Sequence, residues 1–396
     1  MRQQLNICNI YIMLWCLYSL QGTLYASGGI ISQGILAILL VVSLYYFFVV
    51  NFTMRTPSAI KALNVFIVML TLYGLIYAAS GKIIILQHNG LPIGAVGYLK
   101  NIYMSLLPIY AFYAFTLKGL LTEVNIRRWF IIFIALVTAS YLRVEREALQ
   151  MAMMEGSMQE EFTNNKGYTF LSLMPLLFFF SNNRMVQYIA LAYIMAFIII
   201  GMKRGAILIG AIVVLWFFYQ TLKSSPRKTR LKVVLLIAAI VVATGFYVVN
   251  MLETSEYFQY RIEQTEEGAT SGRDVIFAKL FSYFMHETSA WQFYFGSGAN
   301  HTVAVAGNYA HNDWLELAVN QGCLGIIVYL IYWICMYKTW RKSKINSIIY
   351  ASLGAICIIF FLSTFFSMSY GNMSIYATLC LGYCLANIKK LNGNNI

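Results

Sequence analysis

Long apolar segments recur along almost the whole chain, and they constrain its fold more than any other feature. A helix needs about 20 apolar residues to cross the hydrocarbon core of a bilayer, where each backbone N–H and C=O must bond within the protein. Spans are expected at residues 7–25, 29–50, 60–80, 98–118, 127–142, 164–181, 185–202, 205–222, 231–250, 313–337, 346–368 and 372–388. The sequence therefore predicts an all-α membrane protein, with residues 1–396 as one domain of about 12 transmembrane helices. Because the fifth and sixth segments are short, a total of 11 or 13 transmembrane helices is the alternative.

Composition and charge support the same class. Of all residues, 60% are hydrophobic and 11% are charged, whereas soluble domains carry about 25% charged residues. The net charge of +13 comes from Lys and Arg between apolar segments, which predicts membrane topology and not nucleic-acid binding. Eighteen of the 28 basic residues and only one acidic residue fall on one side of the predicted spans, so that side and both termini are expected to be cytoplasmic. The first segment is either a signal peptide or an uncleaved anchor, and a poor cleavage context near Ala26 favours the anchor.

Two hydrophilic segments are expected on the outer, extracytoplasmic side. Residues 143–163 are predicted to form a short helix, and residues 251–312 form a large loop. Within the loop, SGRDVIFAKLFSYFM predicts an interfacial helix capped by Ser271. A linker that rests on the bilayer and a helix that shapes a site are equally compatible with this pattern. The seven cysteines lie in or against apolar segments and are expected to be free.

Three basic residues of the outer face are candidates for anion binding. Lys203 and Arg204 lie in GMKRGA, at a turn between two apolar segments, and Arg273 begins the loop helix. A guanidinium group binds phosphate in a bidentate fork, so two arginines suit a diphosphate. The alternatives are interfacial snorkelling for Arg204 and a surface ion pair with Asp274 for Arg273. No Asp-x-Asp pair exists to hold a nucleotide-bound metal ion, so neither a metal nor a cofactor is expected.

His311 is the candidate general base. It precedes an apolar segment in AHNDWLELAVNQGCLG, where Asp313 and Glu316 have the spacing of a capping box. The positive end of the helix dipole would keep the imidazole neutral, which is the form that accepts a proton. An interfacial polar histidine beside an ordinary cap is the alternative. The other histidines, His88, His286 and His301, are weaker candidates and show no metal-ligand spacing.

Two pairs of glycines are expected to have structural roles. Gly296 and Gly298 in FGSGAN predict a turn, and Gly322 and Gly325 predict close approach of a neighbouring helix. Charged residues within the apolar segments are scarce, so the sequence gives little support to an ion or proton pathway.

Taken in order, KRGA, SGR, FGSGAN and AHNDWLELAVNQGCLGIIVYLIYW resemble the O-antigen ligase and O-antigen polymerase superfamily of bacterial polytopic membrane glycosyltransferases. The resemblance lies within residues 164–340, whereas the first half is similar only as a bundle of apolar helices. Two positions depart from the pattern. Phe277 stands where relatives often carry tryptophan, and Lys203 where a serine commonly precedes the arginine. Neither departure removes a charged group.

The resemblance implies a donor glycan on undecaprenyl diphosphate and a sugar hydroxyl as acceptor. It assigns the diphosphate to Arg204 and Arg273, with Lys203 beside them, and the activation of the acceptor to His311. Asn312, with Asp313 and Glu316, belongs to the same motif as supporting residues. Transfer with inversion and without a metal ion is expected.

From the resemblance we expect a polymerase-type glycosyltransferase that extends O-antigen or capsular polysaccharide on the outer face of the bacterial inner membrane. Its partners would be the lipid-linked oligosaccharide, the acceptor glycan, the bilayer and a chain-length regulator. The alternatives are a ligase that transfers glycan to lipid A core and, from another class, a polysaccharide or lipid transporter or flippase. A flippase needs no outer base, and it should carry charges along its spans.

Overall fold

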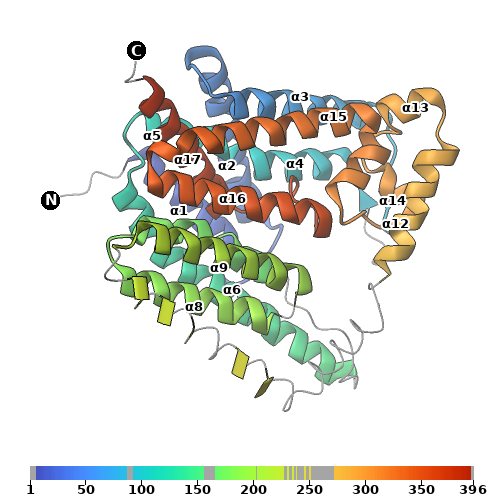
Figure 1. Ribbon diagram of the computed structural model, residues 1–396. Coiled ribbons are helices and arrows are strands. Elements are labelled where there is room, and N and C mark those ends of the chain that lie inside the picture. The colour runs from blue at the N-terminus through green and yellow to red at the C-terminus, as the bar shows by residue number, and fades with distance from the viewer. Residues whose placement is uncertain are drawn as a thin grey trace.

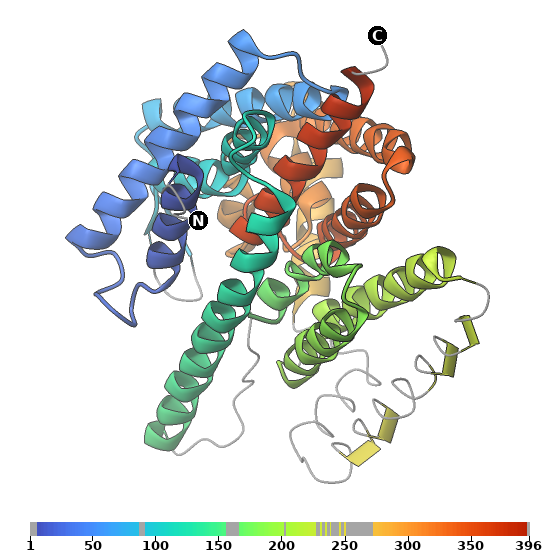
Figure 2. The same ribbon diagram turned by 90° about the vertical axis from the view of Figure 1, so that its left-hand side faces the viewer.

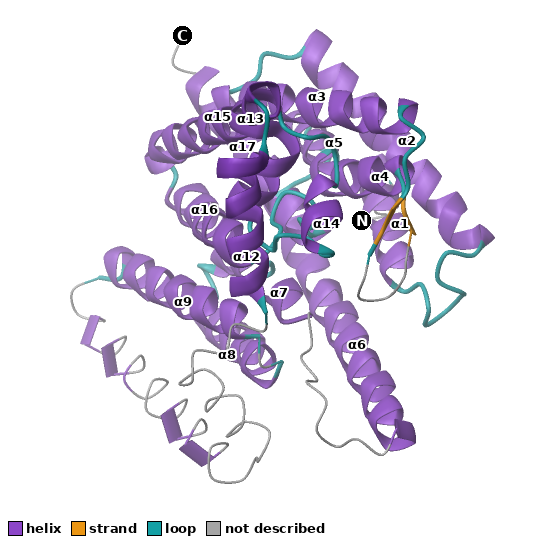
Figure 3. Ribbon diagram, turned by 90° about the vertical axis from the view of Figure 1, so that its right-hand side faces the viewer, coloured by secondary structure: helices purple, strands orange, loops and turns teal. Residues whose placement is uncertain are grey.

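The computed structural model describes residues 6–86, 92–155, 166–201, 203–226 and 272–393, together with short pieces of 230–250 (Figure 1). Its helices are α1 (Ile7–Ser19), α2 (Ile30–Thr53), α3 (Ser58–Ala79), α4 (Ala95–Leu106), α5 (Pro108–Leu117), α6 (Glu123–Glu155), α7 (Lys166–Leu171), α8 (Arg184–Ile200), α9 (Arg204–Ser224), α12 (Arg273–Ser282), α13 (Ala290–Phe295), α14 (His301–Ala306), α15 (Asp313–Lys342), α16 (Ser347–Phe366) and α17 (Ile375–Gly393). The short helical turns are η1 (Met174–Phe180), η2 (Tyr283–Glu287) and η3 (Ser343–Ile345). Strands β1 (Ile84–Ile85) and β2 (Pro92–Ile93) pair in antiparallel fashion (Figure 3). The predicted all-α class is confirmed for the described residues.

Six of the described helices are long and apolar enough to cross a membrane: α2, α3, α6, α9, α15 and α16. Three shorter apolar segments, Ile7–Ser19, Lys166–Phe180 and Arg184–Ile200, fall within other predicted spans. The predicted span at 231–250 lies largely outside the described residues, as does 251–271 of the predicted loop. The number 12 therefore stays a prediction, whereas the membrane class is supported by these helices.

The surface of α2 shows what such a helix requires from its surroundings. Ile30, Val41, Phe48 and Phe52 are all exposed, although each is strongly apolar. In water these side chains would form an unfavourable apolar patch, whereas in the hydrocarbon core of a bilayer they contact apolar lipid tails. All seven cysteines are free, as predicted.

Proline divides two of the predicted spans. The span at 98–118 consists of α4 and α5, which meet at Pro108, a residue with no N–H to continue the helical hydrogen bonds. The span at 164–181 consists of α7 and the 3₁₀ helix η1, which has Pro175 in its first turn and is buried along its whole length. A hydropathy pattern records apolar length and gives no sign of such breaks.

Helix α6 differs from the prediction in the opposite way. Residues 143–155 continue the helix that begins at Glu123, so they do not form a separate short helix. The sequence contains neither glycine nor proline between 123 and 155, and its change from apolar to charged residues near Arg143 does not interrupt the backbone. Residues 156–163 of the predicted segment lie outside the described part of the chain.

The centre of the molecule is formed by α5 and α17. All residues of α5 from Pro108 to Thr116 are buried, and Gly382 of α17 lets the two backbones approach. A Cβ at Gly382 would lie 2.7 Å from the Ile109 carbonyl oxygen. Helices α6, α8 and α9 lie together on one side of this centre (Figure 2). The N- and C-terminal ends lie at one end of the bundle, and α12, α13 and α14 lie at the other (Figure 1).

A kink in α15 receives the segment after α13. Gly322 has φ 66° and ψ −160°, which interrupts the helix. The Ser297 N–H donates to the Val319 carbonyl (2.9 Å), and the Gly298 N–H donates to the Asn320 carbonyl (3.0 Å). Carbonyls at the kink, just before Gly322, are thus bonded by a loop, as buried backbone requires.

The structure tests the roles that were predicted for these two pairs of glycines. Gly296 and Gly298 do make a turn, with φ of 77° and 108°, but the turn is docked onto α15. A Cβ at Gly322 would lie 2.7 Å from the Phe293 carbonyl oxygen, so this glycine admits the backbone of the last turn of α13. The nearest atoms to a Cβ at Gly325 belong to the preceding turns of α15 itself. The predicted close approach of a neighbouring helix is therefore confirmed at Gly322, where the helix is α13, and is wrong at Gly325.

Candidate active site

Three helices begin beside the C-terminal end of α16. The Arg273 guanidinium, at the start of α12, donates to the Phe366 carbonyl (3.0 Å). The Asn312 amide, at the start of α15, donates to the Phe365 carbonyl (3.5 Å). A Cβ at Gly205, in the first turn of α9, would lie 3.3 Å from the Phe366 Cβ. The positive ends of three helix dipoles therefore converge at this place.

Basic side chains occupy these helix starts. Lys203 is the N-cap of α9, Arg204 is its first residue, and Arg273 is the first residue of α12. All three are half-buried. Helix starts that carry basic side chains are suited to binding an anion, because the backbone N–H groups and the side chains both attract negative charge. The sequence singled out these three cations, and the structure places them at neighbouring helix starts.

The cap of α12 differs from the prediction. Its N-cap is Gly272, with φ 72°, whereas Ser271 was expected and lies outside the described residues. Glycine adopts this left-handed conformation without the steric cost of a Cβ. The chain can therefore turn sharply just before Arg273.

His311 lies among these cations. Its backbone has φ 51°, in the left-handed region that non-glycine residues seldom adopt, and its side chain is half-buried. Burial, followed by the positive charges of Arg273 and Lys203, lowers the pKa of His311 below its usual value. The imidazole is therefore neutral at pH 7 and can accept a proton. The direction agrees with the predicted neutral ring, although burial and two side-chain charges produce it.

The predicted capping box is wrong. The N-cap of α15 is Asn312, whose side-chain oxygen accepts from the N–H groups of Trp314 (2.9 Å) and Leu315 (3.1 Å). Because Asn312 supplies the capping oxygen one residue earlier, Asp313 and Glu316 are not needed as caps. Both carboxyl groups instead point into the protein, where they are fully buried.

Glu316 fixes the chain that leads into His311. Its carboxylate accepts from the Ala310 N–H (2.9 Å), the Thr302 hydroxyl (2.6 Å) and the Asn320 amide (2.8 Å). Three neutral donors thus satisfy a buried carboxylate, and one of them is the backbone immediately before His311.

Asp313 fixes the other side of His311. It accepts from the Tyr329 hydroxyl (2.7 Å) and from both the N–H (2.9 Å) and the hydroxyl of Ser369. Ser369 belongs to the connection between α16 and α17, so this carboxylate ties the start of α15 to that connection. The backbone of His311 is held on both sides, which explains how an unfavourable φ persists.

Tyr168 of α7 also borders this site, although nothing in the sequence indicated it. A Cβ at Gly205 would lie 3.5 Å from the ring carbon that carries the Tyr168 hydroxyl, and Arg273 acts on the hydroxyl electrostatically. The chain contains 29 tyrosines, and no local motif distinguishes this one.

The remaining histidines have other surroundings. His301 Nε2 lies 3.0 Å from the Tyr283 hydroxyl, and burial and Lys82 lower the pKa of this ring. His286 is exposed, and His88 lies outside the described residues. Of His301 and His311, only His311 has its pKa lowered by an arginine, Arg273.

Comparison with known proteins does not assign the chain to a family. No family model matches the sequence, and the search of curated proteins finds no match. Among the described residues, no group of three or more His, Cys, Asp or Glu side chains could hold a metal ion. The function is therefore inferred from the site and from the sequence resemblance.

Proposed function

We propose that this chain is a glycosyltransferase of the polymerase type, which extends O-antigen or capsular polysaccharide on the outer face of the bacterial inner membrane. Its donor is a glycan on undecaprenyl diphosphate. One observation carries the proposal: a neutral His311 lies next to Arg273 and Lys203, where three helix N-termini converge. This combination offers an anion-binding group and a proton acceptor in one place.

In the proposed reaction, Arg204 and Arg273 bind the donor diphosphate and Lys203 adds a third positive charge. His311 removes the proton from an acceptor hydroxyl, and that oxygen attacks the anomeric carbon on the face opposite the diphosphate. The bond between the anomeric carbon and the diphosphate oxygen breaks, and the lipid diphosphate leaves with the electron pair. The cations stabilise its growing negative charge, while the proton passes from His311 to water. The product has inverted configuration.

The proposed orientation places α12, α13 and α14 outside and both ends of the chain in the cytoplasm. This is supported by the position of those three helices at the end of the bundle opposite both termini (Figure 1). The same orientation puts the basic residues of the predicted inner loops on the cytoplasmic side.

The test is transfer by purified protein in lipid nanodiscs, with the lipid-linked repeat unit as the sole substrate. A polymerase gives a ladder of products from this substrate alone. Products that appear only after lipid A core is added would identify a ligase. If no glycosidic bond forms under either condition, the proposed function is wrong.

A further inference from the structure

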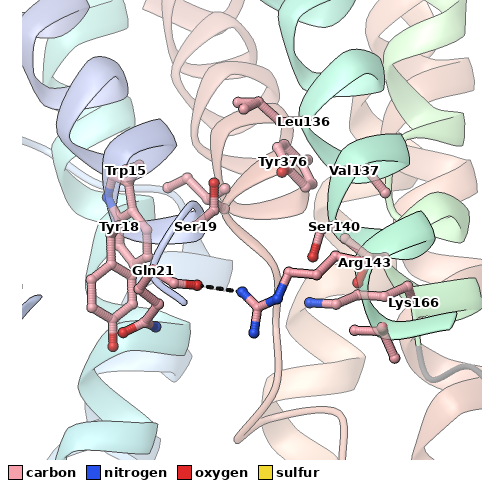
Figure 4. Close-up of a pocket in the computed structure, with 13 residues that line it drawn as sticks. Trp15, Tyr18, Ser19, Gln21, Leu136, Val137, Ser140, Arg143, Lys166 and Tyr376 are labelled. Carbon is pink, nitrogen blue, oxygen red and sulfur yellow. Dashed lines mark hydrogen bonds between the residues drawn. The ribbon is translucent and has the colours of Figure 1, made fainter. Parts of the chain in front are cut away.

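A cavity of about 320 Å³ lies between α1, α6, α7 and the start of α17 (Figure 4). Its lining includes Trp15, Ser140, Arg143, Lys166, Thr169 and Tyr376. Two of these described residues are basic and none is acidic. The cavity is separate from the His311 site, since no residue named there lines it.

The two basic side chains lie next to each other. In Figure 4 the charged ends of Arg143 and Lys166 approach one another across the cavity, and their charges interact. Arg143 Nη1 also donates to the Gln21 carbonyl (2.8 Å) and the Thr23 hydroxyl (3.2 Å), which holds the guanidinium against the connection between α1 and α2. Two neighbouring cations of this kind can both donate charge-assisted hydrogen bonds to one phosphate group.

The rest of the cavity combines apolar and neutral polar groups. Figure 4 shows Trp15, Leu136, Val137 and Tyr376 to one side of the basic pair, with the Ser140 hydroxyl between them. A cavity with cations at one end and aromatic and aliphatic groups at the other fits a phosphate that carries an organic substituent.

Helix α7 separates this cavity from the His311 site. Lys166 and Thr169, three residues apart and so on one face, line the cavity, whereas Tyr168 lies beside Gly205 and Arg273. Phosphate groups bound in the two places would therefore lie on different faces of one short helix.

We propose that this cavity binds the diphosphate of the acceptor, while the His311 site binds the diphosphate of the donor. The inference rests on the proposed function: a ladder made from one substrate requires that the acceptor is lipid-linked too. The acceptor hydroxyl lies on the sugar farthest from its own lipid, so its diphosphate must be held away from the reacting atoms. A second cationic site near the first meets that requirement.

Binding stoichiometry tests the cavity without any catalytic readout. The probe is radiolabelled undecaprenyl diphosphate, and the protein is held in nanodiscs of phosphatidylcholine. We expect two equivalents per wild-type chain. Lys166→Gln should weaken one equivalent about tenfold to a hundredfold, the range for a charge-assisted hydrogen bond, and Lys166→Arg should restore it. Arg273→Gln should weaken the other equivalent. Lys100→Gln, an exposed lysine on α4, is the matched control and should leave both unchanged.

Several outcomes overturn the inference. One equivalent in the wild type, or two unchanged equivalents in Lys166→Gln, would show that the cavity is not a phosphate site. Displacement of the second equivalent by phosphatidylglycerol in the nanodisc would assign the cavity to bulk anionic lipid. Displacement by inorganic diphosphate at the same concentration as the probe would assign it to a free anion.

A kinetic comparison tests the link to the acceptor. Transfer is measured to a lipid-linked acceptor and to the same oligosaccharide without lipid diphosphate. Lys166→Gln should lower the ratio of the two kcat/KM values about tenfold or more, whereas Lys100→Gln should keep the wild-type ratio. An unchanged ratio in Lys166→Gln would overturn the acceptor assignment. Complete absence of transfer in the wild type would instead refute the proposed function, and the stoichiometry would still decide the cavity.

Discussion

Two groups of basic side chains border different faces of α7, and they differ in the other functional groups that lie near the cations. Lys203, Arg204 and Arg273 stand at helix starts, and His311 lies within their field. Around Arg143 and Lys166 the cavity offers hydroxyl, amide and apolar groups but no histidine or carboxyl group among its described lining residues. Both groups can attract phosphate. Only the first adds a group that can take a proton near neutral pH.

The two groups also differ in how they are held. Arg143 is fixed by bonds to the Gln21 carbonyl and the Thr23 hydroxyl, within a surface connection. His311 is fixed by buried carboxylates on either side, Asp313 and Glu316, and its backbone stays in an unfavourable conformation. A binding site tolerates small movements of its cations. A base must keep its ring at one distance from the reacting hydroxyl, which accounts for the more extensive support.

The largest expected effect is at the base. His311→Ala should reduce transfer about a hundredfold to ten-thousandfold, which is the usual contribution of general-base catalysis. His301→Ala is the control, because it removes a half-buried imidazole that bonds to Tyr283 outside the cation cluster. Initial rates with lipid-linked donor, at equal amounts of folded protein, measure both. Near-normal transfer by His311→Ala would show that the first group of cations has no general base beside it, so the proposed difference between the two groups would be wrong.

The next effect separates the two sites by arginine geometry. Arg273→Lys keeps the charge but loses the planar fork and the bond to the Phe366 carbonyl, so transfer should fall about tenfold to a hundredfold. Arg204→Lys should act in the same direction. Arg143→Lys keeps a positive charge in the cavity that is proposed to bind the acceptor diphosphate and to take no part in proton transfer. The loss of kcat in this variant should therefore be smaller. Equal losses of kcat in Arg273→Lys and Arg143→Lys would contradict the comparison.

A third prediction concerns the support of His311. In Glu316→Gln an amide NH₂ replaces one carboxylate oxygen, so at least one of the Ala310, Thr302 and Asn320 donors loses its acceptor. The free energy of unfolding should fall by about 1–3 kcal/mol, the cost of a buried unsatisfied group, and kcat should fall with it. Thermal unfolding in detergent measures the first effect. Exposed Glu287→Gln is the control, and equal melting temperatures for the two variants would refute the supporting role.

The smallest effect is on pH dependence. Because burial, Arg273 and Lys203 lower the pKa of His311, the neutral ring persists as the pH falls through 6.5 and is lost only near the lowered pKa. Lys203→Gln removes one of these charges and raises that pKa, so the acid limb of kcat/KM should move to higher pH by less than about one unit. Lys166→Gln should leave the limb in place. If the acid limb moves in both variants, or in neither, the claim that only the cations beside His311 influence its pKa is wrong.

Sequence reasoning succeeded where one local property decides the structure. Apolar length located α2, α3, α9, α15 and α16 to within a few residues, because a bilayer demands that length. The sequence also singled out His311, Lys203, Arg204 and Arg273 by their place on the predicted outer face; the structure brings them to neighbouring helix starts, and their roles stay predictions.

It failed where the decision depends on backbone geometry or on distant residues. Asn312 and Asp313 are both good capping residues, and only the dihedral angles of the entering chain select Asn312. The change of polarity at Arg143 resembled a helix boundary although the helix continues. The cavity was not predicted, because Trp15, Arg143 and Tyr376 come together only in the folded bundle.

The kink of α15 has a consequence for the order in which the molecule assembles. The segment that bonds to the Val319 and Asn320 carbonyls, around Ser297 and Gly298, leaves the ribosome before α15 does. It can dock only after α15 has been synthesised and has bent at Gly322, because a straight helix would bond the Val319 and Asn320 carbonyls within itself. Docking of this segment thus follows the synthesis of α15, and so does the bond from the Ala310 N–H to Glu316, just before His311. The chain therefore completes the candidate site only after α15 has been made, so partly synthesised chains lack it.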